Sequence, residues 1–224
     1  MRKRTKLADR LLPRYSRGEE IMNMVTHIVG GGMGIIALIL CVLRSYAHQN
    51  ILGLVGSTIY GVTMILLYSI SSIYHGLRCE VGKKVMQVID HCAIYFLIAG
   101  TYTPIMLSSF VPVNPALGWG LLGGEWILCA LATTLTAIDL KIYQVFSMIC
   151  YIGMGWGIIF FIPIAVALLT PAGFGFLLAG GIVYTIGAVL YGIGSRKPWM
   201  HSIFHIFVVL GSLFQLISIY FYVL

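Results

Sequence analysis

A small set of ionisable side chains interrupts stretches of sequence that are otherwise apolar. Its members are His27, His75, Asp90, His91, Glu125, His201 and His205. A charged residue costs about 3 kcal/mol or more at the centre of a membrane-spanning helix. Residues of this kind in an apolar stretch are therefore the first candidates for binding or catalysis.

Three of these histidines have the type and spacing of a metal site. His201 and His205 form an H-x-x-x-H pattern, and residues four apart lie on one face of a helix. With His75 they offer three neutral nitrogen ligands. Three protein ligands and one open position are typical of catalytic zinc sites. Imidazole also binds other transition-metal ions, so the sequence leaves the identity of the ion open.

Asp90 and Ser71 are the candidate catalytic residues beside such an ion. We expect Asp90 to hold the metal-bound water or to hydrogen-bond a ligand imidazole, with a role as fourth ligand as the alternative. Ser71 lies one helical turn before His75 on the same face, where its hydroxyl can donate to that water or to a substrate carbonyl. The alternative for Ser71 is a hydrogen bond to a carbonyl of its own helix.

A second polar face begins the first apolar stretch. Glu20, Asn23 and His27 are spaced i, i+3 and i+7, which places them on one face of a helix. They can support the metal site by hydrogen bonds or relay protons, and the alternative is ordinary polar capping at a helix start. His91 is rotated about 100° from Asp90 around the helix axis, so we expect it to face a neighbouring helix.

The composition indicates which elements position these groups. Hydrophobic residues make up 59% of the 224 residues and charged residues only 9%, whereas a soluble domain carries about 25% charged residues. A soluble enzyme, a disordered protein and a free nucleic-acid-binding domain are thereby excluded. The fold class predicted is an all-α bundle of transmembrane helices, each about 20 residues long. Seven spans are predicted: Ile21–Leu43, Ile51–Tyr74, Val88–Phe110, Leu117–Ile138, Val145–Leu169, Gly173–Tyr191 and His201–Val223.

Basic residues predict the orientation of these helices. Seven lie in the first twenty residues and six in the loops after the second, fourth and sixth spans, whereas only Arg44 lies on the other side. Because basic residues accumulate in cytoplasmic segments, the N-terminus is predicted inside and the C-terminus outside. His75, Asp90, His201 and His205 then all lie at cytoplasmic helix ends. This convergence favours a shared metal site over separate contacts with lipid headgroups.

The chain is predicted to divide into a basic cytoplasmic tail, 1–20, and a single seven-helix membrane domain, 21–224. The tail sets topology and attracts anionic headgroups, so membrane lipids are the expected partners and nucleic acid is not. The oligomeric state is left open. Glu125 falls near the outer end of the fourth span and is expected to be unrelated to the histidines. The cysteines predict no disulfide framework, because none falls in an external loop.

Several segments closely resemble the bacterial hemolysin III family. They are Ser71-Ser-Ile-Tyr-His75, the run from Asp90 to Pro104, His201-Ser-Ile-Phe-His205, and the Glu20-x-x-Asn23-x-x-Thr-His27 pattern. That family belongs with the progestin and adiponectin receptors (PAQR) and, more remotely, with alkaline ceramidases.

The resemblance implies a seven-helix protein of the bacterial plasma membrane with a zinc ion near its cytoplasmic face. By this likeness His75, His201 and His205 are ligands, Asp90 holds the metal water and Ser71 lines the site.

Three functions are compatible with these features. The first is an intramembrane zinc hydrolase of lipid amide or ester bonds, with Asp90 as general base and Ser71 near the oxyanion. The second, suggested by the family name, is a cytolysin that permeabilises membranes, although no polar stripe runs through the full depth of the predicted spans. The third is a non-catalytic sensor in which zinc holds the helices together.

Overall fold

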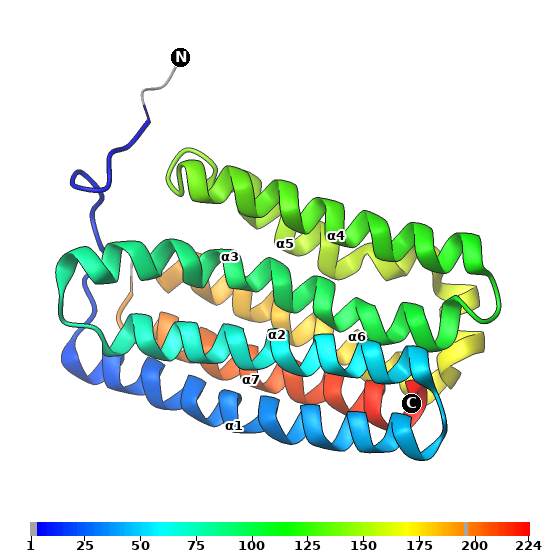
Figure 1. Ribbon diagram of the computed structural model, residues 1–224. Helices are drawn as coiled ribbons and strands as arrows, with labels where there is room; N and C mark the ends of the chain where they lie inside the picture. Colours follow the sequence, from blue (N-terminus) through cyan, green and yellow to red (C-terminus); the bar gives the residue numbers. More distant parts are fainter. Residues whose placement is uncertain (1–3, 195–196) are drawn as a thin grey trace.

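The computed structural model describes residues 4–194 and 197–224, and every regular element within these ranges is helical (Figure 1). Short π-helical segments follow α3 and α7, and a 3-10 segment joins α5 to α6. Arg2, Lys3 and Arg196, which contributed to the predicted orientation, lie outside the described residues. The main helices are α1 (Arg17–Ala47), α2 (Ile51–Gly76), α3 (Glu80–Ile105), α4 (Pro115–Ile138), α5 (Gln144–Trp156), α6 (Ile162–Gly194) and α7 (Met200–Ser218).

Six helical segments in the described part of the chain are long and apolar enough to cross a membrane. The prediction of an all-helical, multi-pass membrane protein is therefore confirmed. One of the six extends from Gln144 to Ile193 and contains both α5 and α6. At the ends that carry the candidate site, the boundaries of α1, α2 and α7 lie within four residues of the predicted spans, whereas α3 begins at Glu80, eight residues before the predicted start at Val88.

The helix α6 is broken at Thr170, whose φ of 61° and ψ of 161° are not helical. Pro171 follows, and a proline disfavours helical geometry in the residue before it. The Thr170 hydroxyl accepts a hydrogen bond from the backbone N–H of Gly173 at 3.3 Å, so it caps the helix that restarts there. Figure 1 shows α5 running toward the end of the bundle where this break lies, and the later part of α6 returning.

Glycines allow the helices that position the histidines to approach closely. The ring of Tyr68 on α2 packs over Gly30 of α1, where an added Cβ would lie 2.5 Å from a ring carbon. Gly56 of α2 faces the backbone of Pro104 on α3, with 2.6 Å from an added Cβ to the proline Cα. Lipid tails are as apolar as side chains, so close packing of this kind drives helix association in membranes.

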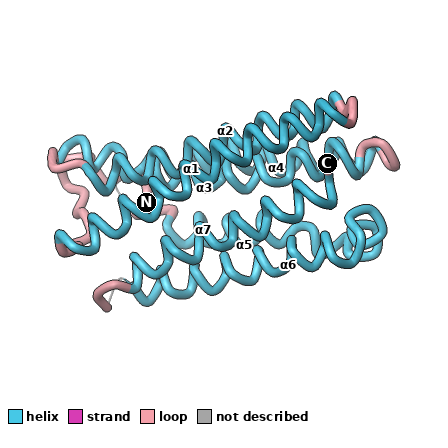
Figure 2. The backbone as a smooth tube through the Cα atoms, turned by 90° about the horizontal axis from the view of Figure 1, so that it is seen from below, coloured by secondary structure: helices cyan, strands magenta, loops and turns pink. Residues whose placement is uncertain are grey.

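The first and last helices are neighbours in space. The helix α1 packs against α2 and α7, and α7 packs in turn against α6. Figure 2 shows these helices running along a common direction. This arrangement brings the start of α1, the end of α2 and the start of α7 to the same end of the bundle.

The segment before α1 lies against that same end. The Arg4 guanidinium donates to the carbonyl of Ile138 at the end of α4, at 3.0 Å. The Lys84 ammonium on α3 donates to the carbonyl of Ala8 at 3.1 Å. Residues 4–15 thus form a docked segment across the end of the bundle, beyond what its basic composition alone predicted.

Asp139 anchors this docked segment. It is buried just after α4, and its carboxylate accepts backbone N–H groups of Thr5 at 2.5 Å and of Lys141 and Ile142 at 3.0 Å each. Burial raises the pKa of Asp139, but the N–H groups of Thr5, Ile142 and Lys141 outweigh it and hold that pKa below its ordinary value. The aspartate is therefore ionised at neutral pH, when it binds the segment.

Candidate functional site

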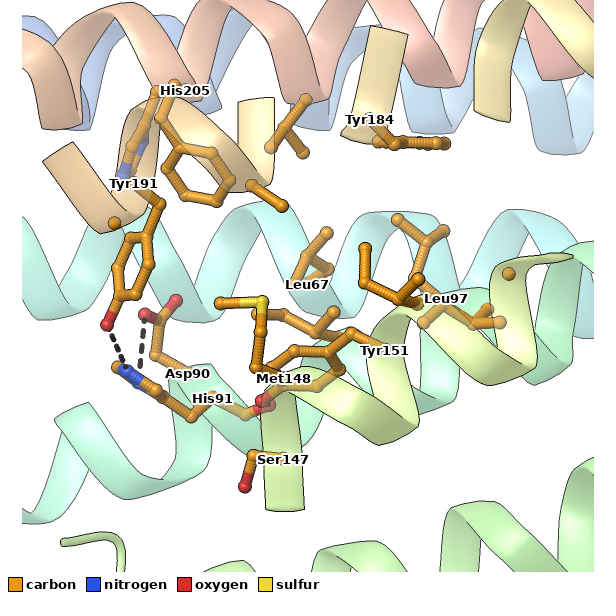
Figure 3. Close-up of a pocket in the computed structure, with 18 of the residues that line it drawn as sticks. Leu67, Asp90, His91, Leu97, Ser147, Met148, Tyr151, Tyr184, Tyr191 and His205 are labelled. Carbon is orange, nitrogen blue, oxygen red and sulfur yellow. Dashed lines mark hydrogen bonds and ion pairs between the residues drawn. The ribbon is translucent and has the colours of Figure 1, made fainter. Parts of the chain in front are cut away.

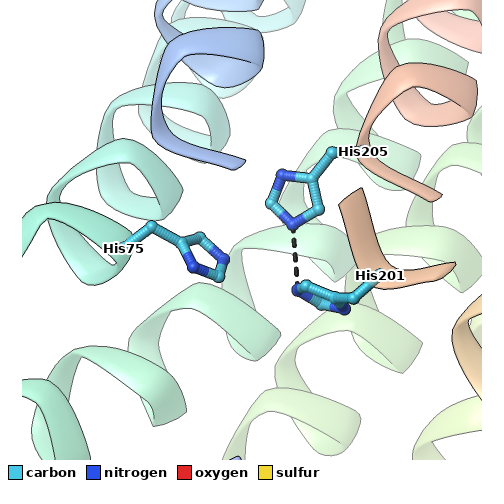
Figure 4. A group of neighbouring side chains, drawn as sticks. All are labelled: His75, His201 and His205. Atoms are coloured by element: carbon cyan, nitrogen blue, oxygen red, sulfur yellow. Dashed lines mark hydrogen bonds between the residues drawn. The ribbon is translucent and has the colours of Figure 1, made fainter. Parts of the chain in front are cut away.

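The structure brings together the three histidines that the sequence singled out as metal ligands (Figure 4). His75 comes from the last turn of α2, and His201 and His205 from the first two turns of α7. One nitrogen of each lies within 4.8 Å of the others, and the Nε2 atoms of His201 and His205 are 3.0 Å apart. All three residues are buried, with exposed fractions of 3%, 8% and 2%.

The donor set fits a metal ion. The Nε2 atom of His75 is buried and has no hydrogen-bond partner among the described residues. A buried polar atom without a partner is costly, and a cation shared with the other two imidazoles would remove that cost. Three neutral imidazole nitrogens are ligands that zinc readily accepts. The arrangement therefore suits zinc or a similar ion.

Glu20 holds His75 in the orientation that such a site requires. The carboxylate oxygen Oε2 lies 2.7 Å from His75 Nδ1, and Oε1 accepts from the Lys83 ammonium at 2.5 Å. Asn23 Nδ2 lies farther from the same nitrogen, at 3.4 Å. We assign the Nδ1 proton to the shorter contact, so the lone pair is on Nε2, which faces His201 and His205. A carboxylate behind a histidine in this way orients metal-binding imidazoles in many proteins.

His27, the third member of that polar face, lies deeper than Glu20 and touches a different histidine. Its ring stacks on His205 with centroids 3.9 Å apart and meets the edge of Tyr68. Both of its ring nitrogens are buried without a partner among the described residues. The predicted support group thus divides: Glu20 and Asn23 contact His75, whereas His27 contacts His205.

Glu19 links the start of α1 to the start of α7 beside the site. Its Oε2 accepts from the backbone N–H of Ser16, and its own N–H donates to the Ser16 hydroxyl, which is a capping box at the start of α1. Its Oε1 accepts the backbone N–H of Trp199 at 2.7 Å, just before α7. Glu19 was not among the predicted site residues, although the S-x-x-E pattern at Ser16 was a signal for the cap.

Tyr15 was also missed by the sequence analysis. Its ring stacks on His201, with centroids 4.7 Å apart and an interplanar angle of 15°. It lies in the docked segment before α1, and burial raises the pKa of its phenol well above the ordinary value. The phenol is therefore neutral and covers one histidine from the tail side. No local sequence pattern indicates such a contact, because it depends on where the segment docks.

Asp90 and Ser71 lie in the wall of the same cavity as His201 and His205. Ser71 lies next to the Asp90 carboxylate, whose side chain is 16% exposed. Asp90 Oδ2 also lies 3.8 Å from His91 Nδ1. The prediction that Ser71 and Asp90 belong to one site is therefore compatible with the geometry, and their roles stay predictions.

His91 contributes to this wall as well as facing a neighbouring helix. Its Nε2 lies 3.2 Å from the Tyr191 hydroxyl of α6, and its Nδ1 lies 2.8 Å from the Gln87 carbonyl of its own helix. Figure 3 shows Asp90, His91, Tyr191 and His205 on one side of the pocket, with Leu97 and Tyr184 toward the other side. Helical rotation alone predicted that His91 faces a neighbouring helix and not the site. It does contact α6, but it also lines the cavity.

The cavity is long and largely apolar beyond the histidines. Its volume is about 1120 Å³, at the upper end of small-molecule pockets. Its polar end includes His27, Ser71, Asp90, His91 and His201, and its far wall includes residues such as Leu97, Ile98, Phe174 and Leu177. Basic side chains of the docked segment and of loops, Arg10, Arg14, Lys141 and Lys197, lie near the polar end. The shape suits a long apolar chain with one polar end.

Glu125 and the cysteines lie apart from the histidines. Glu125 is buried on α4, with its Oε2 lacking a partner among the described residues, and Oε1 faces Gly157. All five cysteines are free thiols. Cys79 and Cys92, which lie nearest the predicted cluster in sequence, are not part of the three-histidine group.

Comparison with known proteins identifies the family. A family model described as haemolysin-III related matches residues 15–216. The chain is 39% identical over 206 residues to Hemolysin-3 of Bacillus cereus, covering 92% of each chain. It is 36% identical over 204 residues to the Hemolysin-3 homolog of Bacillus subtilis (strain 168), covering 91% of this chain and 94% of that one.

A more distant similarity extends to animals. The human monocyte to macrophage differentiation factor is 26% identical over 160 residues, which is 67% of this chain and 63% of that protein. The match to the family model covers the whole candidate site, from Glu20 to His205. The chain therefore belongs to the haemolysin-III-related family of multi-pass membrane proteins, within the PAQR superfamily.

Proposed function

We propose that this protein is a zinc-dependent intramembrane hydrolase of lipid amide or ester bonds. One observation carries the proposal: the three buried imidazoles lie close together, and two of them, those of His201 and His205, line the polar end of a cavity whose far wall is largely apolar. A lipid with its carbonyl near the histidines and its chain along the far wall matches that distribution of polarity.

His75, His201 and His205 would hold the zinc ion. When bound there, zinc supplies Lewis acidity that polarises a carbonyl and lowers the pKa of a coordinated water to about 7. Glu20 keeps the Nδ1 proton of His75 in place and so keeps Nε2 available. Tyr15 and the docked segment cover the site from the aqueous side.

Asp90 is the general base in this proposal. Its carboxylate faces the cavity and accepts the proton of the attacking water, while the Ser71 hydroxyl orients that carboxylate or donates to the developing oxyanion. On the other side of the Asp90 carboxylate, His91 contacts the hydroxyl of Tyr191. The apolar wall excludes bulk water from the chain of the substrate.

We also infer seven crossings with the N-terminus in the cytoplasm. A straight helix of 50 residues, the length from Gln144 to Ile193, would be about 75 Å long, more than twice the hydrocarbon core of about 30 Å. The break at Thr170 divides this length into two crossings. The described lysines at this end, Lys83 and Lys84 near the start of α3 and Lys141 and Lys197 in loops, would then all be cytoplasmic.

Cysteine labelling tests this topology. In a cysteine-free background, Gln49→Cys should react with a membrane-impermeant maleimide from outside intact cells, and Lys141→Cys only after permeabilisation. The opposite pattern would refute the orientation.

The hydrolase is tested with purified protein in nanodiscs. Metal content is measured by mass spectrometry, and released fatty acid is measured on a panel of ceramides, phospholipids and neutral esters. We expect His75→Ala and His201→Ala to lose both metal and turnover, and Asp90→Ala to retain metal but lose turnover. His48→Ala is the matched control, because that histidine contacts the Leu224 carbonyl and lies far from the site in the chain. A metal-loaded wild-type protein that hydrolyses no lipid of the panel would refute the proposal of a hydrolase.

The name of the Bacillus cereus relative, Hemolysin-3, favours a second candidate, a membrane-permeabilising activity. Leakage of dye from liposomes that continues after His75→Ala, with no lipid product, would support that function instead. A third candidate is a sensor in which zinc only holds the helices together, through its ligands on α2 and α7. Loss of thermal stability on chelation, without turnover in the loaded protein, would favour it.

A further inference from the structure

A second polar group lies along the cavity, deeper in the bundle than His75, His201 and His205. Its members are Tyr68 on α2, Tyr184 on α6, and Ser212 and Gln215 on α7. Tyr184 and Gln215 line the cavity itself. Gln215 is ten residues beyond His205, which corresponds to about 15 Å along a helix, or half of a hydrocarbon core of about 30 Å. This mid-cavity polar group therefore lies where the wall would otherwise meet the middle of an acyl chain.

Gln215 presents an unused acceptor at this depth. The residue is 6% exposed, and its Nε2 donates to the carbonyl of Leu177 on α6 at 3.1 Å. Its Oε1 is buried and has no partner among the described residues. Exchanging the two amide atoms would place one acceptor against another at Leu177, so the contact itself fixes the amide orientation. The acceptor is left for something that occupies the cavity.

Tyr184 presents a donor to the same cavity. The Tyr68 hydroxyl donates to Ser212 Oγ at 2.7 Å, and Ser212 Oγ lies 2.6 Å from the Tyr184 hydroxyl. When Ser212 donates its single proton to Tyr184, the proton of Tyr184 is free to donate onward. Ser212 and Gln215 are three residues apart and so share a face of α7.

The two helices meet at this point with little space between them. An added Cβ on Gly180 would lie 2.6 Å from Gln215 Nε2, and one on Gly211 would lie 2.8 Å from the Tyr184 ring. Both side chains are thus held in place by a close crossing of α6 and α7. A fixed acceptor and a fixed donor together are complementary to a hydroxyl group, which can donate to one and accept from the other.

We propose that the cavity selects lipid chains that carry a hydroxyl group near the middle of the chain, recognised by Gln215 and Tyr184. This inference rests on the proposed function in that a lipid chain occupies the cavity, but it does not require turnover. The recognition is a property of binding and is measured without any reaction.

The test compares ricinoleate with oleate, which differ by one mid-chain hydroxyl. Each displaces the fluorescent fatty acid cis-parinarate from the zinc-loaded, full-length protein in nanodiscs. A net hydrogen bond predicts that ricinoleate binds about three- to tenfold more tightly than oleate. A fatty acid hydroxylated beside its carboxyl group should gain no comparable preference.

Gln215→Leu should remove the preference for ricinoleate while oleate binds as before, and Tyr184→Phe should reduce it. Ser218→Ala is the matched control, since Ser218 is buried on the same helix and donates to the Gly173 carbonyl of α6 at 2.8 Å. It should retain the preference.

Two results would overturn the inference in distinguishable ways. Equal affinities for the two fatty acids in the wild type would refute hydroxyl selection while leaving lipid binding intact. Failure of both fatty acids to displace the probe would refute the shared premise and the proposed function with it. If Gln215→Leu does not fold, Tyr184→Phe still decides, because a preference unchanged in that variant contradicts the role of its hydroxyl.

Discussion

Replacing Glu20 by glutamine should weaken zinc binding without removing any ligand. Glu20 Oε2 lies 2.7 Å from His75 Nδ1, and the side chain is 20% exposed. Glutamine preserves the shape but removes the negative charge that makes the imidazole a better donor to a cation. Loss of a partner behind a metal-binding histidine costs about 10- to 100-fold in affinity.

The structure argues for the lower end of that range. Lys83 already neutralises part of the charge through its contact with Glu20 Oε1 at 2.5 Å, and the Glu20 side chain is partly exposed. We therefore expect about a tenfold loss, equivalent to about 1.4 kcal/mol. Lys83→Met should act in the opposite direction and tighten zinc binding slightly, because it frees the charge of Glu20 for His75.

Zinc affinity is measured by competition with a chelating fluorophore on purified protein. Glu80→Gln is the matched control, because Glu80 lies at the same end of the bundle, pairs with Lys84 at 2.7 Å, and has a side chain 73% exposed. It should leave affinity unchanged. An unaltered affinity in Glu20→Gln, or an equal loss in Glu80→Gln, would refute the reasoning that this carboxylate acts through His75.

Two other predictions concern the scaffold around the site. Gly56→Ala should destabilise the protein by about 1–3 kcal/mol, because the added Cβ would lie 2.6 Å from the Cα of Pro104. Thermal unfolding measures this loss. Gly123→Ala is the control, because a Cβ added at Gly123 meets open space. Asp139→Asn should free the docked segment and speed its cleavage by protease. Because the pKa of Asp139 is lowered, the docking it provides should be constant from about pH 8 to pH 5 and lost only below the ordinary aspartate pKa of about 3.9. Cleavage that accelerates already near neutral pH would contradict this anchor.

Much of the fold could be predicted from hydrophobic length alone. The predicted span beginning at Ile51 coincides with the first residue of α2, and α7 begins at Met200, one residue before the predicted start. Lipid imposes this regularity, because a spanning segment must satisfy its own backbone hydrogen bonds. The break at Thr170 coincides with the predicted boundary between two spans, yet the helix on either side is otherwise continuous.

The candidate site was predictable where it depends on spacing within one helix. The i, i+4 pair His201 and His205 and the polar face that begins with Glu20 follow from helical geometry. The contacts of Tyr15 and Glu19 were not predicted, because they join segments far apart in the chain. Such contacts depend on how the docked segment and the start of α7 meet, which no periodicity encodes.

The positions of the three histidines in the chain determine when, during synthesis, the metal site can form. His75 emerges from the ribosome with the second helix, whereas its two companions arrive only with the last one. Because domains are synthesised from the N-terminus onward, no partly inserted chain can assemble the full imidazole trio. Capture of an ion would thus mark a chain whose insertion is complete, and a polypeptide truncated before α7 would remain unable to hold one.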